Sequence, residues 1–169
     1  MAKNPDATHA TQIVRAIESD VPIILQMIRD LAEYERMADE VVATEAVLRE
    51  SLFGARPDAE VLIAYADGQP AGFALYFHNY STFVGRRGLY LEDLFVKPAF
   101  RGRGIGKRLL VELARIAIDR GCGRFEWAVL DWNEPAIGFY KSLGAQCMDA
   151  WSTFRVTGDA LTRLAGSPD

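Results

Sequence analysis

The chain has 169 residues, of which 50% are hydrophobic and 25% are charged, and its formal net charge is −4. These values are typical of one globular domain whose core is large enough to fold without disulfides. The slight negative charge argues against a nucleic-acid-binding protein. No apolar run is long enough to span a bilayer, so no membrane association is expected.

The cysteines and the N-terminus indicate a cytoplasmic protein. Cys122 and Cys147 form no disulfide framework, and neither has a Cys or His neighbour at the spacing of metal ligands. We therefore expect no metal site. The first residues, MAKNPDATHATQ, lack the apolar segment of a secretion signal. Residues 1–11 are polar and are expected to form a mobile tail, followed by a single domain over residues 12–169.

The first part of the chain predicts a strand and two helices. The strand is IVRAI at 13–17, and Asp20 is a suitable N-cap for the helix that follows. Apolar residues recur in that helix at helical spacing as far as Tyr34. Thr44 begins a second, short helix that Gly54 ends.

The rest of the chain predicts strands and helices in alternation. A hairpin over 61–78 turns at DGQP, and a further strand covers 86–96. The later elements are a helix from the glycine-rich segment to about Arg120, a strand at 124–130, a helix at 133–143 and a last strand at 151–156. This order is typical of a mixed α/β domain.

The segment FRGRGIGKRL at 100–109 has glycines at alternate positions 102, 104 and 106, and basic residues surround them. Glycine allows unusual backbone angles and the close approach of a ligand. The first amides of the following helix lack intrahelical acceptors, so they can bind an anion such as a pyrophosphate. A glycine-rich turn with solvated basic residues would produce the same pattern.

Two common phosphate-binding motifs do not fit this segment. A Walker A loop needs a glycine where the chain has Arg101, and a Ser or Thr where it has Arg108. A dinucleotide fingerprint beginning at Gly102 needs a third glycine where the chain has Lys107, and one beginning at Gly104 needs it at Leu109. The glycine pattern therefore belongs to a different kind of strand-to-helix loop.

RGRGIG resembles the R/Q-x-x-G-x-G/A loop of the GNAT superfamily of N-acetyltransferases. The flanking segments LYLEDLFVKPAF and VLDWNEPAIGFYKSLGA resemble one branch, the diamine (spermidine/spermine) acetyltransferases and their thialysine Nε-acetyltransferase relatives. The resemblance covers nearly the whole chain. It implies an α+β fold whose mixed, mostly antiparallel central sheet is splayed at its middle and flanked by helices. It also implies acetyl-CoA as cofactor and a homodimer.

The resemblance implies that acetyl-CoA lies in the opening of this sheet. Backbone groups of the strand 86–96 would hold its pantetheine arm, the glycine loop its pyrophosphate, and the helix 133–143 its other side. Ordinary core packing would also account for the strand residues. The predicted cofactor-binding residues are Leu94, Phe95, Val96, Arg101, Gly102, Arg103, Gly104, Ile105, Gly106, Lys107, Asn133, Pro135, Ala136 and Tyr140.

The expected chemistry is direct attack of a neutral amine on the thioester through a tetrahedral intermediate. An alkyl amine has a pKa near ~10 and must lose a proton first, and Glu92 is the predicted base, acting through water. The resemblance implies that the Leu94 N–H stabilises the oxyanion and that Tyr140 protonates the leaving thiolate. Glu92 and Asp93 are adjacent on a strand and should face opposite sides. Core packing of Tyr140 and plain surface exposure of both carboxylates are the alternatives.

The substrate is expected to be a small primary amine. Tyr34 and Glu35 match an acidic pair of the polyamine-acetylating relatives, although Glu35 could simply be solvated. Ser81 and Phe83 replace an Asp and a Trp of those relatives, and a segment with consecutive glutamates is shortened after Gly144. A lysine-like amino acid such as thialysine is therefore favoured over a polyamine. The predicted substrate-binding residues are Tyr34, Glu35, Ser81, Asp93, Glu126 and Trp127.

A second hypothesis is a domain that binds acyl-CoA without turnover, as a sensor. Tyr140 and Glu92 favour the enzyme, because a sensor needs neither an acid nor a base. The two histidines carry no prediction of catalysis, since His9 lies in the tail and His78 in a strand.

Overall fold

The computed structural model describes residues 11–166, which divide into two compact units, one up to Ala128 and one from Val129. Each unit is described by itself. Of the expected N-terminal tail, all but Thr11 lies outside the described residues. The prediction of a single domain over residues 12–169 stays a prediction.

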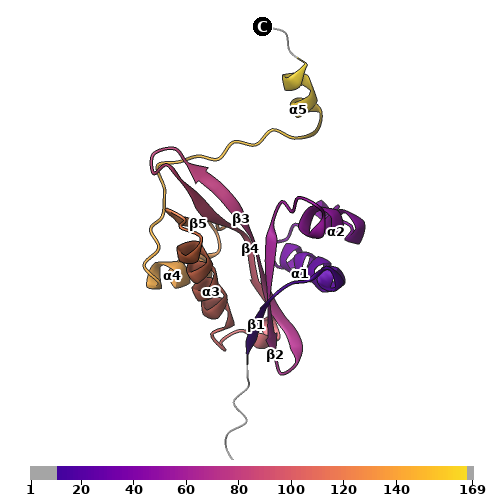
Figure 1. Cartoon of the computed structure of the whole chain (residues 1–169), viewed down its shortest axis with the longest axis vertical. Helices are drawn as coiled ribbons and strands as arrows, with labels where there is room; N and C mark the ends of the chain where they lie inside the picture. The colour runs from indigo at the N-terminus through magenta and orange to yellow at the C-terminus, as the bar shows by residue number, and fades with distance from the viewer. Residues whose placement is uncertain (1–10, 167–169) are drawn as a thin grey trace, which may run out of the picture. The chain divides into compact units, whose positions relative to one another are not determined.

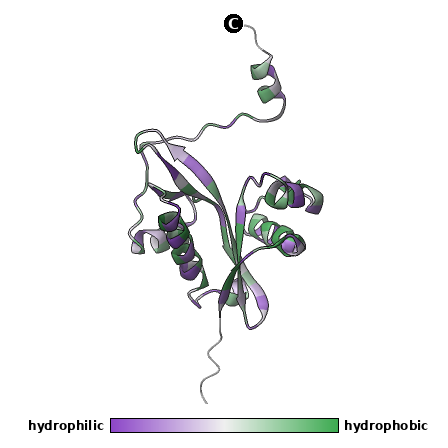
Figure 2. Cartoon of the chain, in the orientation of Figure 1, coloured by the Kyte–Doolittle hydropathy of each residue, from purple (hydrophilic) through white to green (hydrophobic). Residues whose placement is uncertain are grey.

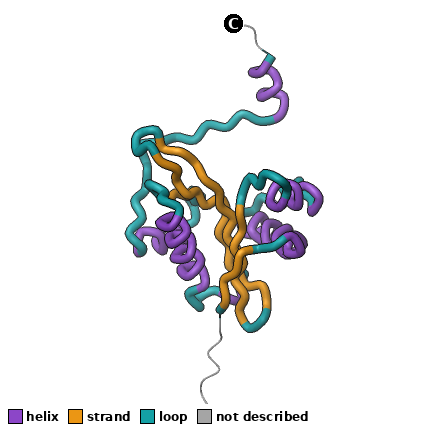
Figure 3. The backbone as a smooth tube through the Cα atoms, viewed as in Figure 1, coloured by secondary structure: helices purple, strands orange, loops and turns teal. Residues whose placement is uncertain are grey.

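The first unit is built on a five-stranded sheet in the order β1-β2-β3-β4-β5 (Figures 1 and 3). Neighbouring strands from β1 to β4 are antiparallel, and β5 runs parallel to β4. The mixed, mostly antiparallel sheet predicted from the sequence is therefore confirmed. The strands are β1 (Gln12–Arg15), β2 (Glu60–Ala66), β3 (Gln69–Ser81), β4 (Arg86–Val96) and β5 (Phe125–Trp127).

The predicted hairpin is formed by β2 and β3. The turn between them places Asp67 at φ 54° and Gly68 at φ 73°. Two successive positive φ values are what a two-residue turn requires to match the twist of its strands. The predicted strand over 124–130 is shorter than expected, because β5 pairs with β4 only through Phe125, Glu126 and Trp127.

Helices cover both faces of the sheet in this unit. In Figure 1, α1 (Val21–Tyr34) and α2 (Glu45–Phe53) lie on one face and α3 (Ile105–Asp119) on the other. Short 3-10 turns occupy Glu18–Asp20, Ala38–Glu40 and Pro98–Phe100. Figure 2 shows apolar residues along the sides of these helices that meet the sheet. Burial of these apolar stripes supplies most of the driving force for packing.

The predicted helix starts are confirmed in position but differ in detail. The hydroxyl of Thr44 accepts a bond from Val47 N at 3.3 Å, as an N-cap should. Asp20 precedes α1, but its carboxylate accepts from Ile17 N at 2.9 Å and makes no cap bond to the helix. The 3-10 turn before α1 lies within reach of this carboxylate, so Asp20 closes that turn instead.

The C-terminal end of α3 is attached to the sheet by a polar cluster. Arg120 makes a paired contact with Glu60, with one distance of 2.8 Å, and the Tyr76 hydroxyl donates to the same carboxylate at 3.2 Å. His78 Nε2 lies 3.5 Å from Arg120. Burial first, and then the charge of Arg120, lower the pKa of His78. His78 thus belongs to a structural network in the sheet.

The second unit contains α4 (Glu134–Ser142) and α5 (Gly158–Ala165). The helix predicted at 133–143 is confirmed, and Asn133 caps it by accepting from Ala136 N at 3.4 Å. The strand predicted over 151–156 is wrong, and α5 was not predicted. Within the described part of this unit no strand pairs with residues 151–156, and Phe154 is 91% exposed. An alternating sequence forms a strand only where a neighbour completes its ladder.

Candidate active site

The strand β4 carries a bulge at Glu92. Leu75 of β3 is opposite Asp93, whereas the next residue, Tyr76, is opposite Leu91, so Glu92 is an extra residue without a partner in β3. A bulge bends the strand and changes which face the later side chains meet. Phe95 accordingly belongs to the core around α1 and α2, whereas Leu91 is buried outside that core. The simple alternation that separated Glu92 from Asp93 in the sequence analysis is therefore wrong here.

Beyond the bulge, β4 has one open side. The described β5 pairs only with Leu89, Tyr90 and Leu91. Lys97 N donates to Ala71 O at 2.9 Å, which sets the phase of the ladder between β3 and β4. Hydrogen-bonded and non-hydrogen-bonded pairs alternate in antiparallel strands. Since Lys97 is hydrogen-bonded to Ala71, the residues one and three positions before Lys97 have backbone groups that face away from β3.

The residues placed in this way are Leu94 and Val96, opposite Ala74 and Gly72. Their N–H and C=O groups point to the side where β5 has ended. Phe95 is in the opposite phase, so its backbone groups face β3 and its side chain is 4% exposed. Two of the three predicted β4 residues thus have backbone groups suited to an extended ligand.

The glycine loop follows β4 and leads into α3. Gly102 and Gly104 have φ values of 75° and 74°, and no heavy atom lies within 4 Å of the position that a Cβ would take on either. Glycine is needed here for its backbone conformation, since only glycine adopts the left-handed region without cost. Gly104 is the N-cap of α3 and offers no side-chain bond to the first-turn amides. Those amides can therefore donate to an anion.

The basic residues of the loop have distinct partners. Arg103 Nη1 donates to Asp67 at 3.0 Å, and Arg103 Nη2 is buried without a hydrogen-bond partner among the described residues. Arg108 donates to Thr11 O at 2.7 Å, and Lys107 is exposed. A buried donor without an acceptor is rare and costly, so Arg103 Nη2 fits an anionic ligand such as a pyrophosphate.

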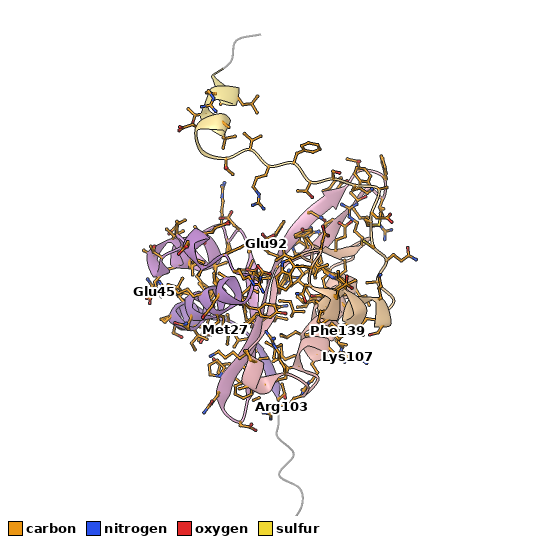
Figure 4. The ribbon with its side chains drawn as sticks, turned by 180° about the vertical axis from the view of Figure 1, so that it is seen from behind. Met27, Glu45, Glu92, Arg103, Lys107 and Phe139 are labelled. Atoms are coloured by element: carbon orange, nitrogen blue, oxygen red, sulfur yellow. The ribbon has the colours of Figure 1, made fainter. Side chains whose placement is uncertain are left out.

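Two contacts hold the loop on the sheet. Ile105 is 1% exposed and anchors the start of α3 in the core. A Cβ at Gly106 would lie 3.8 Å from the Val96 side chain, so this position is in ordinary contact with β4. In Figure 4 the labelled Arg103 lies near the lower end of the sheet in this view, and Glu92 lies further up along it.

Three carboxylates influence one another beside the bulge. Burial first, and then the charges of Glu92 and Glu35, raise the pKa of Asp93 to about 6. Burial also raises the pKa of Glu35, which follows α1 directly. The structure thus brings together Glu35, Glu92 and Asp93 from two elements that are distant in the sequence. Their combined negative charge favours a cationic group.

Tyr34 is placed beside the glycine loop. The Arg101 guanidinium lies 4.5 Å from the centre of the Tyr34 ring. This contact was not predicted from the sequence, and neither was the ion pair between Arg103 and Asp67. The Asp-Gly turn was visible in the sequence, but no local pattern links it to an arginine on a later loop.

The remaining predicted substrate residues of the first unit have structural contacts. Ser81 is 5% exposed, and its hydroxyl accepts from Val84 N at 3.3 Å in the turn after β3. It lies roughly 20 Å along β3 from the residue opposite Asp93, at the usual rise of a strand. Glu126 pairs with Arg124 at 2.7 Å, and the Trp127 ring packs on Phe125 at 4.9 Å. Within one chain, Ser81 therefore does not lie beside Glu35, Glu92 and Asp93.

The second unit carries the other predicted cofactor residues on or beside α4. Asn133 is its N-cap, and Pro135 and Ala136 form its first turn. The rings of Phe139 and Tyr140 are 5.5 Å apart. The position of these residues relative to the glycine loop stays a prediction.

Two absences apply to the part of the chain that the structure describes. No three or more His, Cys, Asp or Glu side chains there are grouped so that they could hold a metal ion. No helix there combines the length and the apolar character needed to cross a membrane.

Solved structures with similar folds include proteins described as acetyltransferases. An integron cassette protein from the mobile metagenome of V. cholerae has a TM-score of 0.79 and 29% identity, with 93% of this chain and 98% of that chain covered. An aminoglycoside acetyltransferase from a soil metagenome has a TM-score of 0.74 at 20% identity, covering 87% of this chain and 95% of that chain, and shows likeness of fold alone.

Sequence relatives extend over almost the whole chain. A thialysine N-epsilon-acetyltransferase of Sus scrofa is 44% identical, with 93% of this chain and 99% of the relative covered. An L-ornithine N5-acetyltransferase of Arabidopsis thaliana is 33% identical, with 91% and 87% covered. The model of the acetyltransferase (GNAT) family matches residues 25–145. The chain therefore belongs to the GNAT family and is an N-acetyltransferase.

Proposed function

We propose that this protein transfers the acetyl group of acetyl-CoA to a primary amine of a small, lysine-like molecule. The observation that carries the proposal is the arrangement along β4. The carboxylates at the bulge, the outward-facing backbone groups of Leu94 and the N–H of Val96 follow one another along β4, and the glycine loop comes after the end of the strand. One strand thus offers a path for an extended, anionic acyl carrier and a negative environment for an amine.

Acetyl-CoA, when bound, supplies an acetyl group activated as a thioester. The amides at the start of α3 and Arg103 Nη2 would hold its pyrophosphate, because Gly104 offers those amides no side-chain cap bond and Arg103 Nη2 has no hydrogen-bond partner among the described residues. Lys107 would add charge at the exposed side of the loop. Backbone groups of Leu94 and the N–H of Val96 would hold the pantetheine arm. Asn133, Pro135 and Ala136, in the second unit, are the further residues that we propose to contact acetyl-CoA.

The protein groups then handle the protons and the developing charge. Glu92, through a water molecule, accepts the proton of the attacking amine, since a protonated amine cannot form the new N–C bond. The N–H of Leu94 stabilises the negative charge that develops on the carbonyl oxygen. The leaving thiolate would need a proton, and Tyr140, on α4 of the second unit, is the residue that we propose as its donor. Asp93 and Glu35 attract the cationic end of the substrate.

The proposed substrate is an amino acid with a side-chain amine. The relatives named above act on thialysine and L-ornithine, and both molecules carry such an amine. Ser81 stands where an acidic residue is found in the polyamine-acetylating relatives, and its hydroxyl is used in a turn. This substitution weakens the attraction for a second distant cation, so we rank polyamines second.

We further propose a homodimer in the cytoplasm. The exposed apolar side chains of Trp151 and Phe154, at 74% and 91%, are the kind of surface that a partner chain covers. Cys122 and Cys147 are both free thiols, which is usual in a reducing compartment. Light scattering at micromolar concentration tests the dimer, and a monomer would contradict it.

The proposal is tested by measuring thiol release from acetyl-CoA with a panel of amines. The panel contains thialysine, lysine, ornithine, putrescine, spermidine, spermine and a peptide with a free N-terminus. We expect the highest kcat/KM with the amino acids and little turnover of the polyamines. A strong preference for spermidine would overturn the substrate ranking, and no turnover of any amine would overturn the proposed reaction.

The role of Tyr140 is tested by Tyr140→Phe. We expect kcat to fall about 100-fold, the usual range for loss of a general acid, because the ring remains and only the proton donor is removed. The Kd for coenzyme A, measured by calorimetry, should change less than about threefold. An unchanged kcat would show that the thiolate leaves without help from this hydroxyl.

A further inference from the structure

The side chain of Arg101 is directed away from the expected pyrophosphate position. Its Nε donates to Val96 O at 3.0 Å, and its guanidinium carbon lies 4.5 Å from the Tyr34 ring centre and 5.8 Å from that of Phe95. Phe95 belongs to the core around α1 and α2, on the face of the sheet opposite α3 (Figure 1). The first residue of the glycine loop therefore contacts the face of the sheet that bears α1.

The end of α1 is fixed by its own backbone. Arg36 adopts φ 62°, which is uncommon for a residue other than glycine. Met37 N donates to Ala32 O at 2.8 Å and Arg36 N to Glu33 O at 3.1 Å, which together form a Schellman motif. This termination sets the directions of the two residues before it, Tyr34 and Glu35. Whatever holds Tyr34 in place also holds Glu35.

We propose that Arg101 is a positioning residue for the amine site, which ties the end of α1 to β4 by stacking on Tyr34 and binding Val96 O. The inference rests on the proposed function, because it needs Glu35, Glu92 and Asp93 to receive the amine. Glu35 comes from α1 and the other two from β4, so their spacing depends on how closely the two elements are held. Arg101 contacts both, through its stack on Tyr34 and its bond to Val96 O, in addition to the apolar packing of Phe95 with α1.

Lysine cannot replace arginine in this role. The planar guanidinium stacks on a ring and donates from Nε at the same time, whereas an ammonium is a single point of charge. Arg101→Lys keeps the positive charge next to the cofactor loop and removes the geometry. It therefore separates a role in positioning the amine site from a role in neutralising the pyrophosphate.

The test measures the KM for the best amine of the panel, kcat, and the Kd for coenzyme A in the full-length protein. For Arg101→Lys we expect KM to rise about tenfold, while the Kd for coenzyme A changes less than about threefold. Tyr34→Leu should raise KM by a similar factor. The KM of the double variant should be at most about twice that of the more impaired single variant, because both substitutions break the same contact. Arg49→Lys, which removes a guanidinium from the exposed pair with Glu18 at 3.1 Å, is the matched control.

Three outcomes would overturn the inference. A rise in the Kd for coenzyme A with an unchanged KM would make Arg101 a pyrophosphate ligand. Independent, multiplicative effects of the two substitutions would show that the stack couples nothing. A fall in melting temperature with unchanged KM would leave only a structural role. If Arg101→Lys does not fold, the KM of Tyr34→Leu for the amine decides whether the stack positions the amine site. Failure of the wild-type protein to acetylate any amine would instead count against the proposed function.

Discussion

The glycine loop follows the end of β4 and the carboxylate cluster lies beside the bulge of the same strand, yet the two are built differently. The loop is a continuous segment whose donors are backbone amides set by glycine φ values of 75° and 74°. The cluster consists of side chains from α1 and β4, and their burial and mutual charge raise the pKa of Asp93. Anion recognition here depends on backbone conformation, and cation recognition depends on which side chains tertiary packing brings together. Substitutions that alter a side chain should therefore affect the cluster, and substitutions that alter backbone freedom should affect the loop.

The largest expected effect is that of Glu92→Gln, which removes the proposed base and keeps the shape of the side chain. We expect kcat to fall about 100-fold or more, with the Kd for coenzyme A unchanged. Glu18→Gln, at an exposed carboxylate paired with Arg49, is the control and should leave kcat within about twofold. If Glu92→Gln is as active as the wild type, the base is another group, and the same steady-state assay on Asp93→Asn is the next measurement.

For Gly104→Ala, in the glycine loop, we expect a tenfold change in the Kd for coenzyme A. A left-handed conformation costs a residue with a Cβ about 1–2 kcal/mol, so the loop spends less time in the binding conformation and the Kd for coenzyme A rises about tenfold. Gly85→Ala is a matched control, because Gly85 has φ 67° and equal space around it but lies in the turn between β3 and β4. The melting temperature should fall by a similar amount in both variants. Calorimetry should find weaker binding of coenzyme A only for Gly104→Ala. Equal binding by the two would mean that the loop backbone does not recognise the anion.

The cluster also predicts a dependence of stability on pH. Burial first, and then the charges of Glu92 and Glu35, raise the pKa of Asp93 from its ordinary value of 3.8 to about 6. Between these pH values the folded state holds a proton that the unfolded state has lost. The contribution of this group to stability is therefore present below about pH 4 and is lost as the pH rises through about 6. Asp93→Asn removes this loss, which amounts to at most about 3 kcal/mol. Between pH 4 and pH 7 the melting temperature of the variant should rise relative to that of the wild type. Parallel curves of melting temperature against pH for the two proteins would contradict the raised pKa.

The smallest effect is expected for Asp67→Asn, which frees Arg103 from its ion pair. Exposed pairs of this kind contribute about 0–1 kcal/mol, and asparagine tolerates the positive φ of this position. We expect a melting temperature within about 2 °C of the wild type, and a Kd for coenzyme A that falls by no more than about threefold as Arg103 loses its competing partner. Weaker binding would mean that Asp67 holds Arg103 in the orientation that the anion needs.

The sequence by itself determined the parts of this protein that depend on neighbouring residues. The glycine loop, the caps at Thr44 and Asn133, and the Asp67-Gly68 turn are each set by backbone angles or by bonds a few residues apart, so their spacing in the chain is enough to predict them. Apolar periodicity likewise predicted α1 and α3, because each needs only one buried face.

Only the tertiary structure decided the features that join distant segments. The bulge at Glu92 depends on how β3 pairs with β4, and it reversed the expected relation of Glu92 and Asp93. The stack of Arg101 on Tyr34 exists because packing brings the loop to the end of α1. The segment at 151–156 was predicted to be a strand but has no strand to pair with in the described part of its unit. A sequence pattern states which structure a segment prefers, and the neighbours that meet its hydrogen bonds, charges and apolar faces decide whether that preference is realised.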